Sequence, residues 1–470
     1  MSAAAPPEPS SAALNARHSC EGGNPASFAR YPKYKNSGVA WLGEVPAHWD
    51  LCSLRRRVAM NPSKSEIATL DRDLEISFLP MEAVGEQGQL DLDRKRPIRE
   101  VENGYTYFHD GDVTFAKITP CFENGKGALM RGLTNGAGFG TTELTVIRSK
   151  PELLYPEFLD WLLRTVEFRG QGEASMYGAG GQKRVPDDFV RDFRAAFPPA
   201  HEQVVIAAFL DRETTKIDAL IAEQEKLITL LKEKRQALIS HAVTKGLDLN
   251  APMKDSGIEW LGQVPAHWEI AQIKRLSVVK RGASPRPIDD PKYFDDEGKY
   301  AWVRISDVSS SNGVLAETTQ RLSDLGSSLS VKLAPGSLFV SIAGTVGKPC
   351  ITGIDACIHD GFVYFPTLKL DPKFLYRIFE AGRCYAGLGK FGTQLNLNTD
   401  TIGSISIAVP PKDEMREVLS QLDSLTGTLD SLVGQAECAS GLLRERRAAL
   451  ISAAVTGKFD VRQMVGDVAA

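Results

Sequence analysis

The sequence lacks the features of membrane-spanning, secreted and metal-binding proteins. No apolar run approaches the roughly eighteen residues of a membrane-spanning helix, and the first residues lack the basic and apolar regions of a signal peptide. The seven cysteines form no Cys-x-x-Cys pair, and the seven histidines show no metal-ligand spacing. Scattered cysteines in odd number fit a reducing compartment. We therefore predict a cytoplasmic protein without a metal site and without a membrane partner.

Motifs of common catalytic chemistry are also missing. GTVGKP at Gly344 comes nearest to a phosphate-binding loop, but it lacks the first glycine spacing and the final hydroxyl. No Asp/Asn-Pro-Pro-Tyr/Phe segment of an amino-methyltransferase is present, and no paired carboxylates stand out for acid–base chemistry. The glycine clusters at Gly136 and Gly178 are more typical of turns than of cofactor loops. We predict no catalytic residues and no cofactor in this chain.

The sequence does contain a duplication. SGVAWLGEVPAHW at 37–49 returns as SGIEWLGQVPAHW at 256–268, and eleven of the sixteen positions 35–50 are identical in the second copy. A second repeat closes each half, because RQALISHAVTKGLD at 235–248 matches RAALISAAVTGKFD at 447–460 in nine of fourteen positions. FPPAHEQ, which begins at Phe197, also matches VPPKDEM. The segments between the repeats diverge, so we predict two modules with one framework and different loops.

The repeated VPAHW motif has two interpretations. His48 and His267 occur in both copies, as a pair of catalytic histidines would. The motif is also a proline-started turn beside a large aromatic residue, which favours a structural role. We prefer the structural interpretation, in which four tryptophans anchor the modules to two long helices: Trp41, Trp49, Trp260 and Trp268.

Two long helices are the clearest local prediction. Each follows a Pro-Pro pair and repeats apolar residues at three-four spacing over about five heptads. About 43 residues would form a rod of roughly 65 Å with one apolar stripe. We expect the two stripes to pair; the alternative is that each helix lies flat on its own module. The expected inward positions are Ile206, Leu210, Ile217, Leu220, Leu227, Leu231 and Leu238, then Val418, Leu422, Leu425, Leu429, Leu432, Ala436, Ala439, Leu443 and Leu450.

Four segments closely resemble a known family, the DNA-specificity subunits of type I restriction–modification systems: YPKYKNSGVAWLGEVPAHW, GDVTFAKITPCFENGKGA, FPPAHEQVVIAAFLD and RQALISHAVTKG. The second-half copies follow the same pattern, and the resemblance extends from about Tyr31 to Asp460. It implies a non-catalytic subunit whose two target-recognition domains each read half of a bipartite double-stranded DNA site. It also implies two methyltransferase subunits that carry S-adenosylmethionine, and restriction subunits; ATP and Mg²⁺ are likewise expected on the partners.

The predicted fold class is α+β: two α/β target-recognition domains separated by two long antiparallel coiled-coil helices, with an internal pseudo-twofold repeat. The repeats set the borders. We predict a disordered N-terminal tail at 1–30, target-recognition domain 1 at 31–199, the first long helix and linker at 200–250, target-recognition domain 2 at 251–411, the second long helix at 412–460 and a C-terminal tail at 461–470.

Candidate DNA-contacting residues come from glycine-containing loops between strands. The net charge is −4, so we expect partner subunits to supply part of the phosphate grip while these modules read base edges. Lys, Arg, Gln and Asn side chains match the donors and acceptors of the grooves. We predict DNA contacts by Lys117, Thr119, Asn124, Lys126, Gln182, Lys183, Arg184, Arg304, Ser306, Lys348, Lys390, Gln394 and Asn396.

Each of these residues has a plainer alternative role in surface solvation or turn structure. Gln182 and Gln394 occupy matching positions, which slightly favours a framework role for both. Two alternatives also stand for the whole chain: a coiled-coil adaptor or scaffold without DNA recognition, and a metal-dependent nuclease whose site is not visible in the sequence.

Overall fold

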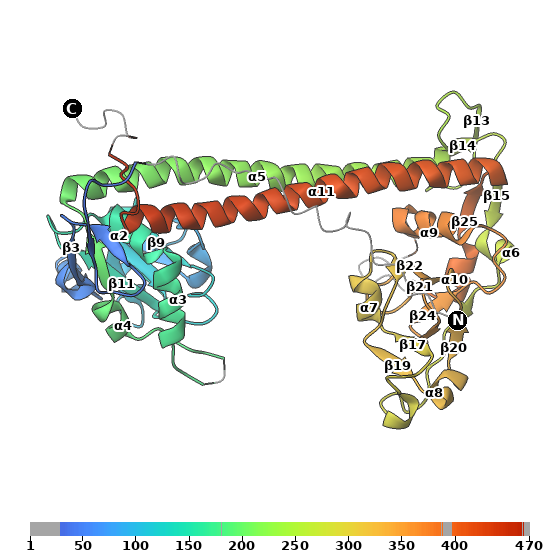
Figure 1. Cartoon of the computed structure of the whole chain (residues 1–470), viewed down its shortest axis with the longest axis horizontal. Coiled ribbons are helices and arrows are strands. Elements are labelled where there is room, and N and C mark those ends of the chain that lie inside the picture. The colour runs from blue at the N-terminus through green and yellow to red at the C-terminus, as the bar shows by residue number, and fades with distance from the viewer. Residues whose placement is uncertain (1–28, 180, 387, 389–396, 463, 465–470) are drawn as a thin grey trace, which may run out of the picture. The chain divides into compact units, whose positions relative to one another are not determined.

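The computed structural model describes residues 29–179, 181–386, 388, 397–462 and 464, which divide into two compact units. Unit 1 comprises residues 1–222 and 440–470, and unit 2 comprises residues 223–439. Each unit holds one α/β module and part of each long helix, α5 (Ala200–Lys245) and α11 (Lys412–Val455) (Figure 1). The predicted fold class is confirmed. Within the described residues, no helix is long and apolar enough to cross a membrane.

The module of unit 1 is built on two four-stranded sheets. The first has the order β4-β11-β8-β9 and is antiparallel throughout: Val58–Met60, Leu144–Ser149, Asp112–Ala116 and Gly127–Leu129. The second has the order β6-β5-β10-β7, with β5 and β10 parallel: Lys95–Pro97, Glu75–Leu79, Ala137–Gly140 and Thr106–His109. Three helices follow the sheets: α2 (Pro156–Leu163), α3 (Val166–Ser175) and α4 (Asp187–Asp192).

The module of unit 2 repeats this plan. Its first sheet has the order β16-β24-β21-β22-β18: Lys280–Arg281, Phe362–Tyr364, Leu338–Ser341, Pro349–Thr352 and Val314–Leu315. Its second has the order β19-β17-β23-β20: Gln320–Leu322, Tyr300–Val303, Ala356–Ile358 and Val331–Leu333. Strands β17 and β23 are parallel, as β5 and β10 are in unit 1. GDVTFAKIT and GSLFVSIAGT therefore supply equivalent strands, β8 and β21.

Short elements complete both modules. The opening repeats form the hairpins β1 (Tyr34–Asn36) with β2 (Glu44–Pro46), and β13 (Met253–Asp255) with β14 (Gln263–Pro265). The strand after each hairpin pairs with the strand that precedes a long helix. These pairs are β3 (Asp50–Ser53) with β12 (Arg194–Phe197), and β15 (Glu269–Gln272) with β25 (Ser406–Val409). The remaining helices are α1 (Ile98–Val101), α6 (Ile273–Leu276), α7 (Ile305–Ser310), α8 (Asp324–Ser328), α9 (Pro372–Ala381) and α10 (Thr399–Ser404).

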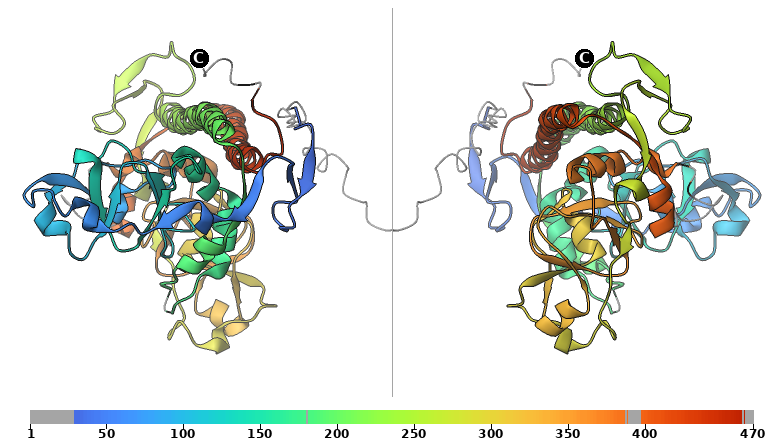
Figure 2. Two further views of the ribbon diagram at one scale, coloured as in Figure 1. Left: turned by 90° about the vertical axis from the view of Figure 1, so that its left-hand side faces the viewer. Right: turned by 90° about the vertical axis from the view of Figure 1, so that its right-hand side faces the viewer.

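In each unit, segments of α5 and α11 lie antiparallel and side by side (Figure 2). In unit 1 the start of α5 shares a hydrophobic cluster with the end of α11; its members include Ile206, Leu210, Ile451 and Val455. In unit 2 the end of α5 shares one with the start of α11; its members include Ile239, Val243, Val418 and Leu422. Ion pairs add to both, with Asp218 Oδ1 2.8 Å from Arg447 Nε in unit 1 and Lys232 Nζ 3.4 Å from Glu437 Oε1 in unit 2.

The predicted inward positions of the helices were wrong at four leucines. Leu220 and Leu227 of α5 are 51% and 43% exposed, and Leu425 and Leu432 of α11 are 44% and 42% exposed. The inward positions lie one residue further along, at Ile221, Ile228, Thr426 and Val433, which are buried or half-buried. Choosing the largest apolar residue at each turn misplaced the stripe.

Threonines can occupy these inward positions because each satisfies its own hydroxyl. Thr214 Oγ1 donates to Leu210 O at 2.6 Å, and Thr426 Oγ1 donates to Leu422 O at 2.6 Å. A hydroxyl bonded to the carbonyl one turn earlier carries no unpaired donor into the interior. A hydrophobicity pattern counts threonine as polar, so it passes over the inward positions of Thr214 and Thr426.

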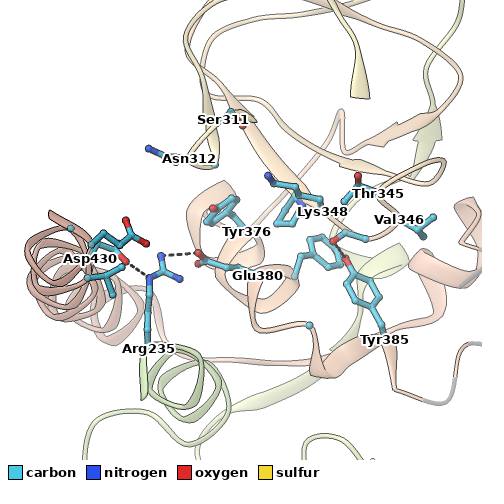
Figure 3. Close-up of a pocket in the computed structure, with 18 residues that line it drawn as sticks. Arg235, Ser311, Asn312, Thr345, Val346, Lys348, Tyr376, Glu380, Tyr385 and Asp430 are labelled. Carbon is cyan, nitrogen blue, oxygen red and sulfur yellow. Dashed lines mark hydrogen bonds and ion pairs between the residues drawn. The ribbon is translucent and has the colours of Figure 1, made fainter. Parts of the chain in front are cut away.

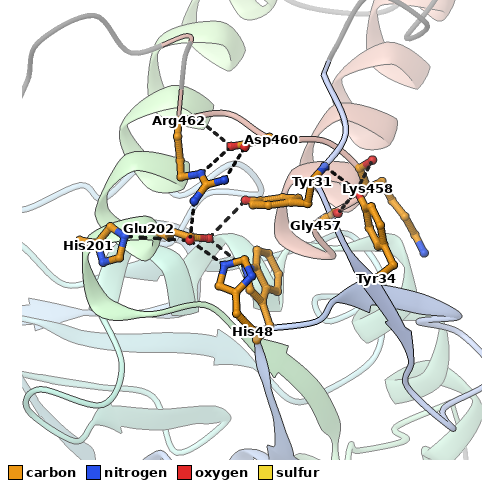
Figure 4. Close-up of polar contacts among 10 residues, drawn as sticks. Tyr31, Tyr34, His48, His201, Glu202, Gly457, Lys458, Asp460 and Arg462 are labelled. Atoms are coloured by element: carbon orange, nitrogen blue, oxygen red, sulfur yellow. Dashed lines mark hydrogen bonds and ion pairs between the residues drawn. The ribbon is translucent and has the colours of Figure 1, made fainter.

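The repeated tryptophan binds a carboxylate in the first turn of a long helix. In unit 1, buried Trp49 donates its Nε1 to Glu202 Oε2 at 3.0 Å, and His48 Nε2 lies 2.7 Å from Glu202 Oε1 (Figure 4). Glu202 is the third residue of α5, where free backbone N–H groups favour a negative charge. Unit 2 has the same contacts, with Glu414 in the third position of α11: Trp268 Nε1 at 3.0 Å and His267 Nε2 at 2.7 Å.

Unit 1 surrounds its carboxylate more completely than unit 2. Tyr31 donates its hydroxyl to Glu202 Oε2 at 3.3 Å, and Arg462 Nη1 donates to Glu202 Oε1 at 3.4 Å. Burial, and next the negative charge of Glu202, raise the pKa of Tyr31. Burial also raises the pKa of Asp460, but hydrogen bonds from Arg462 outweigh it and lower that pKa overall. The predicted anchoring to the long helices is confirmed for Trp49 and Trp268.

The closing repeats reach the same tryptophans. Gly246 follows α5 with φ +72°, and a Cβ built on it would lie 3.2 Å from Trp268 Cζ2. Gly457 follows α11 with φ +70°, and a Cβ there would lie 2.5 Å from Pro46 Cδ. Both sites need glycine for its positive φ and for the close approach. Opening and closing repeats were duplicated because they form one joint in each unit.

Candidate nucleic-acid interface

In unit 1 the structure brings two predicted loops together. Lys117 and Thr119 follow strand β8, whereas Lys183 belongs to a segment between α3 and α4, more than sixty residues later. Thr119 N donates to Lys183 O at 3.0 Å, and Val185 N donates to Lys117 O at 2.9 Å. A short antiparallel bridge between Ile118 and Arg184 joins the same segments. Predicted contacts from distant parts of the chain therefore form one surface.

The described residues of the later segment, 176–179 and 181–185, form a hairpin, which we call the finger. Tyr177 N donates to Arg184 O at 3.2 Å, and Arg184 N donates to Tyr177 O at 2.9 Å. Gly178 has φ +143°, and a Cβ built on it would lie 2.5 Å from Gln182 O, so only glycine permits this approach. Gln182 N donates to Ala179 O at 3.3 Å, which agrees with the turn that the glycine cluster from Gly178 predicted. Gln182 and Lys183 are exposed on the finger.

Arg184 is held by a carboxylate at the base of the finger. Its Nη2 donates to Glu143 Oε1 at 2.7 Å and its Nε donates to Glu143 Oε2 at 2.9 Å. These hydrogen bonds lower the pKa of Glu143. Because both carboxylate oxygens engage one guanidinium, Arg184 is oriented before any ligand arrives. The sequence did not point to Glu143, since nothing in its neighbourhood marks it as a partner of Arg184.

The loop between β8 and β9 is held in place by a half-buried arginine. Arg169 donates to Phe122 O at 3.2 Å and to Leu163 O at 3.0 Å, and its guanidinium lies 4.8 Å from the centre of the Phe122 ring. Burial lowers the pKa of Arg169 to about 10. Asn124 is exposed on this loop, and its backbone N donates to Pro120 O at 3.0 Å. Asn124 therefore projects from a loop of fixed conformation.

In unit 2 the corresponding loop lies beside helix α7. Ser309 Oγ of α7 is 3.2 Å from Thr345 Oγ1 of the loop. The predicted contacts Arg304 and Ser306 stand at the start of this helix, and both are exposed. The Arg304 guanidinium bonds to Gln320 beside a cavity of about 560 Å³. The predicted Lys390, Gln394 and Asn396 lie outside the described residues.

A larger cavity of about 820 Å³ in unit 2 is lined by Lys348 and by an ion-paired arginine (Figure 3). Arg235 Nη2 lies 3.0 Å from Glu380 Oε1, and Arg235 Nε lies 2.8 Å from Asp430 Oδ1. Acidic side chains thus neutralise the arginine that faces the cavity. Among the described residues, no group of three or more His, Cys, Asp or Glu side chains is placed to hold a metal ion.

Two predicted lysines make the same contact in the two modules. Lys126 directly precedes β9 and donates its Nζ to Met81 O at 2.9 Å. Lys348 directly precedes β22 and donates its Nζ to Ser309 O at 2.9 Å. Each acceptor belongs to the short helix that follows the first strand of the parallel pair, β5 or β17. Both lysines therefore fasten their loop to the framework, and their contact with DNA stays a prediction.

Comparisons with known proteins agree with this arrangement. Residues 265–435 match the sequence profile of the Type I restriction modification DNA specificity domain. The chain is 26% identical to the Type I restriction enzyme EcoEI specificity subunit of Escherichia coli, over 88% of this chain and 83% of that protein. It is 38% identical to the EcoAI specificity subunit of Escherichia coli over 40% of this chain and 31% of that protein.

Solved structures share the fold. A chain from a study of complex assembly and conformational transition of the type I R-M system aligns with a TM-score of 0.72 at 17% identity, over 87% of this chain and 98% of that one. The HsdS subunit from Thermoanaerobacter tengcongensis aligns with a TM-score of 0.54 at 17% identity, over 88% and 98%.

The fold defines a class of protein with two equivalent modules, each joined to a long helix through one tryptophan–glutamate contact. The sequence matches narrow this class to one family of proteins. The chain is similar to the specificity subunits of type I restriction enzymes, over 88% of its length for one of them, and the resemblance seen in its motifs is confirmed.

Proposed function

We propose that this chain reads a bipartite double-stranded DNA site, with one half-site for each module, within a type I restriction–modification complex. The observation that carries the proposal is the repeated joint, in which Trp49 binds Glu202 and Trp268 binds Glu414. Equivalent joints carry modules that share the order of eight strands in two sheets but differ in their loops and in the added strand β18 of unit 2. Two modules that are joined to the long helices in the same way but carry different loops are able to read two different sequences independently.

The chemistry of the loops supports base reading. In unit 1 the finger carries exposed Gln182 and Lys183 next to half-buried Lys117. An amide can bond bidentately to adenine and an ammonium can donate to guanine in the major groove. The net charge of −4 leaves little general attraction for phosphate. Partner subunits therefore supply much of the backbone grip in this proposal.

The chemistry of modification and cleavage belongs to other subunits in this proposal. Two methyltransferase subunits carry S-adenosylmethionine, and restriction subunits use ATP and Mg²⁺. The chain itself is non-catalytic and acts in the cytoplasm. The family matches support this division of labour, because the relatives are named as specificity subunits of restriction enzymes.

Selection of DNA from a randomised duplex library tests the proposal. The chain is assembled with its methyltransferase subunits, and bound duplexes are recovered at a fixed salt concentration and sequenced. We expect two short specified sequences separated by an unspecified gap. Binding without sequence preference would contradict the proposal and favour the adaptor hypothesis. Hydrolysis of DNA by the lone chain with a divalent cation would instead favour a nuclease.

A further inference from the structure

Tyr177 stands at the base of the finger with its side chain open to solvent. It is 69% exposed, whereas aromatic residues of the same module such as Phe115, Phe122 and Phe168 are buried. Tyr177 and Arg184 exchange two backbone hydrogen bonds, so their side chains lie on the same face of the hairpin. Gln182, two residues before Arg184, is exposed on the same hairpin. The hairpin therefore presents both an aromatic ring and an amide to solvent.

The base of the finger is fixed, so the ring is presented in a defined place. Glu143 holds the Arg184 guanidinium through two hydrogen bonds, and Thr119 N donates to Lys183 O at 3.0 Å. The ring itself adds little to stability while it is exposed. A single exposed apolar side chain is common on protein surfaces, so exposure alone assigns no role. The role of Tyr177 is inferred from two further features: the hydrogen bonds that fix the hairpin and the polar side chains that it exposes.

The width of a hairpin selects the groove that it can enter. The major groove of B-DNA admits a two-stranded β-ribbon, whereas the minor groove is roughly half as wide. The apolar group that base pairs present in the major groove is the C5-methyl group of thymine. An amide in the same groove bonds to adenine, which is the partner of thymine. The aromatic ring and Gln182 thus suit an A·T-containing half-site.

We propose that Tyr177 is a specificity-determining residue whose ring packs on the C5-methyl group of a thymine in the half-site read by unit 1. The inference rests on the proposed function and adds a named base contact to it. Tyr177 was not among the predicted contacts, because an aromatic residue beside a glycine cluster is equally typical of a buried turn. The exposure of Tyr177 in the structure favours a contact with a ligand over burial in a turn.

Replacing thymine by uracil removes only the methyl group and so tests the contact directly. Each thymine of the unit 1 half-site is changed to uracil in turn, and the dissociation constant is measured for the complex with methyltransferase subunits. At one position we expect roughly fourfold weaker binding, the value for one buried methyl group. Tyr177→Ala should bind the thymine site at least as weakly as the wild type binds the uracil site. Its affinity should no longer change when that thymine is replaced by uracil. Tyr177→Phe keeps the ring, so it should still bind the uracil site more weakly than the thymine site.

Tyr105→Ala is the matched control, because Tyr105 is also exposed, at 42%, but packs edge-on against Phe78 at the other sheet. We expect this variant to respond to uracil as the wild type does. If the wild-type complex selects no sequence, the proposed function fails. If it selects a site but wild type and Tyr177→Ala respond alike to every uracil, the function stands and the thymine contact is wrong. Weaker binding by Tyr177→Ala without any uracil effect in the wild type also contradicts the contact.

Discussion

Trp49 and Glu202, 153 residues apart, are joined by a hydrogen bond of 3.0 Å from the indole Nε1 to the carboxylate Oε2. The bond joins the opening repeat of the chain to the first turn of α5, and the pair Trp268–Glu414 repeats it at the same distance. The two carboxylates differ in exposure, since the Glu202 side chain is 2% exposed and that of Glu414 is 29% exposed. The same substitution at Glu202 and at Glu414 can therefore be compared at two joints that differ in the burial of the carboxylate.

Glu202→Ala should destabilise the protein more than Glu414→Ala. The first change leaves the buried Trp49 Nε1 and the Tyr31 hydroxyl without their acceptor, which costs about 3 kcal/mol for hydrogen bonds to a charged group. The second change exposes its donors to water and should cost about 1 kcal/mol. Urea denaturation followed by tryptophan fluorescence measures both free energies of unfolding. Equal costs would show that burial of the carboxylate is not what distinguishes the two joints.

Neighbouring residues of α5 test the corrected helix register. Ile221 is 9% exposed and Leu220 is 51% exposed, so aspartate at the two positions differs in burial alone. We expect Ile221→Asp to lower the free energy of unfolding by about 3 kcal/mol, because it places a charge at a buried position. Leu220→Asp should change it by under about 0.5 kcal/mol. Thermal and urea unfolding of the lone chain measure the effect, and the reverse order would restore the register predicted from leucines.

The finger should depend on pH through Glu143. Arg184 lowers the folded-state pKa of Glu143, so folding favours the ionised carboxylate. The contribution is complete above the ordinary pKa of about 4.3 and is lost as the pH falls below it through the lower folded value. Amide chemical shifts of Tyr177 and Arg184 should therefore move in that acidic range.

Glu143→Gln is the control for this pH effect. It removes the charge at all pH values, and the amide shifts at neutral pH should already resemble those of the acidified wild type. Tryptophan fluorescence reports whether the whole protein remains folded at each pH. Amide shifts of Tyr177 and Arg184 that ignore both acid and Glu143→Gln would show that this ion pair does not organise the finger.

Sequence reasoning succeeded where the chain repeats itself. The duplicated VPAHW segments predicted that Trp49 and Trp268 anchor the modules to the long helices, because identical residues at two places report identical contacts. It failed in the helices, where inward Thr426 was passed over in favour of exposed Leu425. It also missed the common contact of Lys126 and Lys348, since the acceptors Met81 and Ser309 lie in segments that do not align. Backbone carbonyls leave no residue type for a sequence pattern to detect.

The most direct test of the account exchanges one module and asks how many half-sites change. Residues between Pro46 and Pro198 are replaced by the corresponding segment of a related specificity subunit that has tryptophan at the position of Trp49, so its joint partner Glu202 stays in place. Sequencing of methylated adenines in cells that carry the hybrid with its partner subunits reports the site. The account predicts one altered half-site, with the other half-site unchanged. Simultaneous change of both half-sites would contradict independent reading by the two modules.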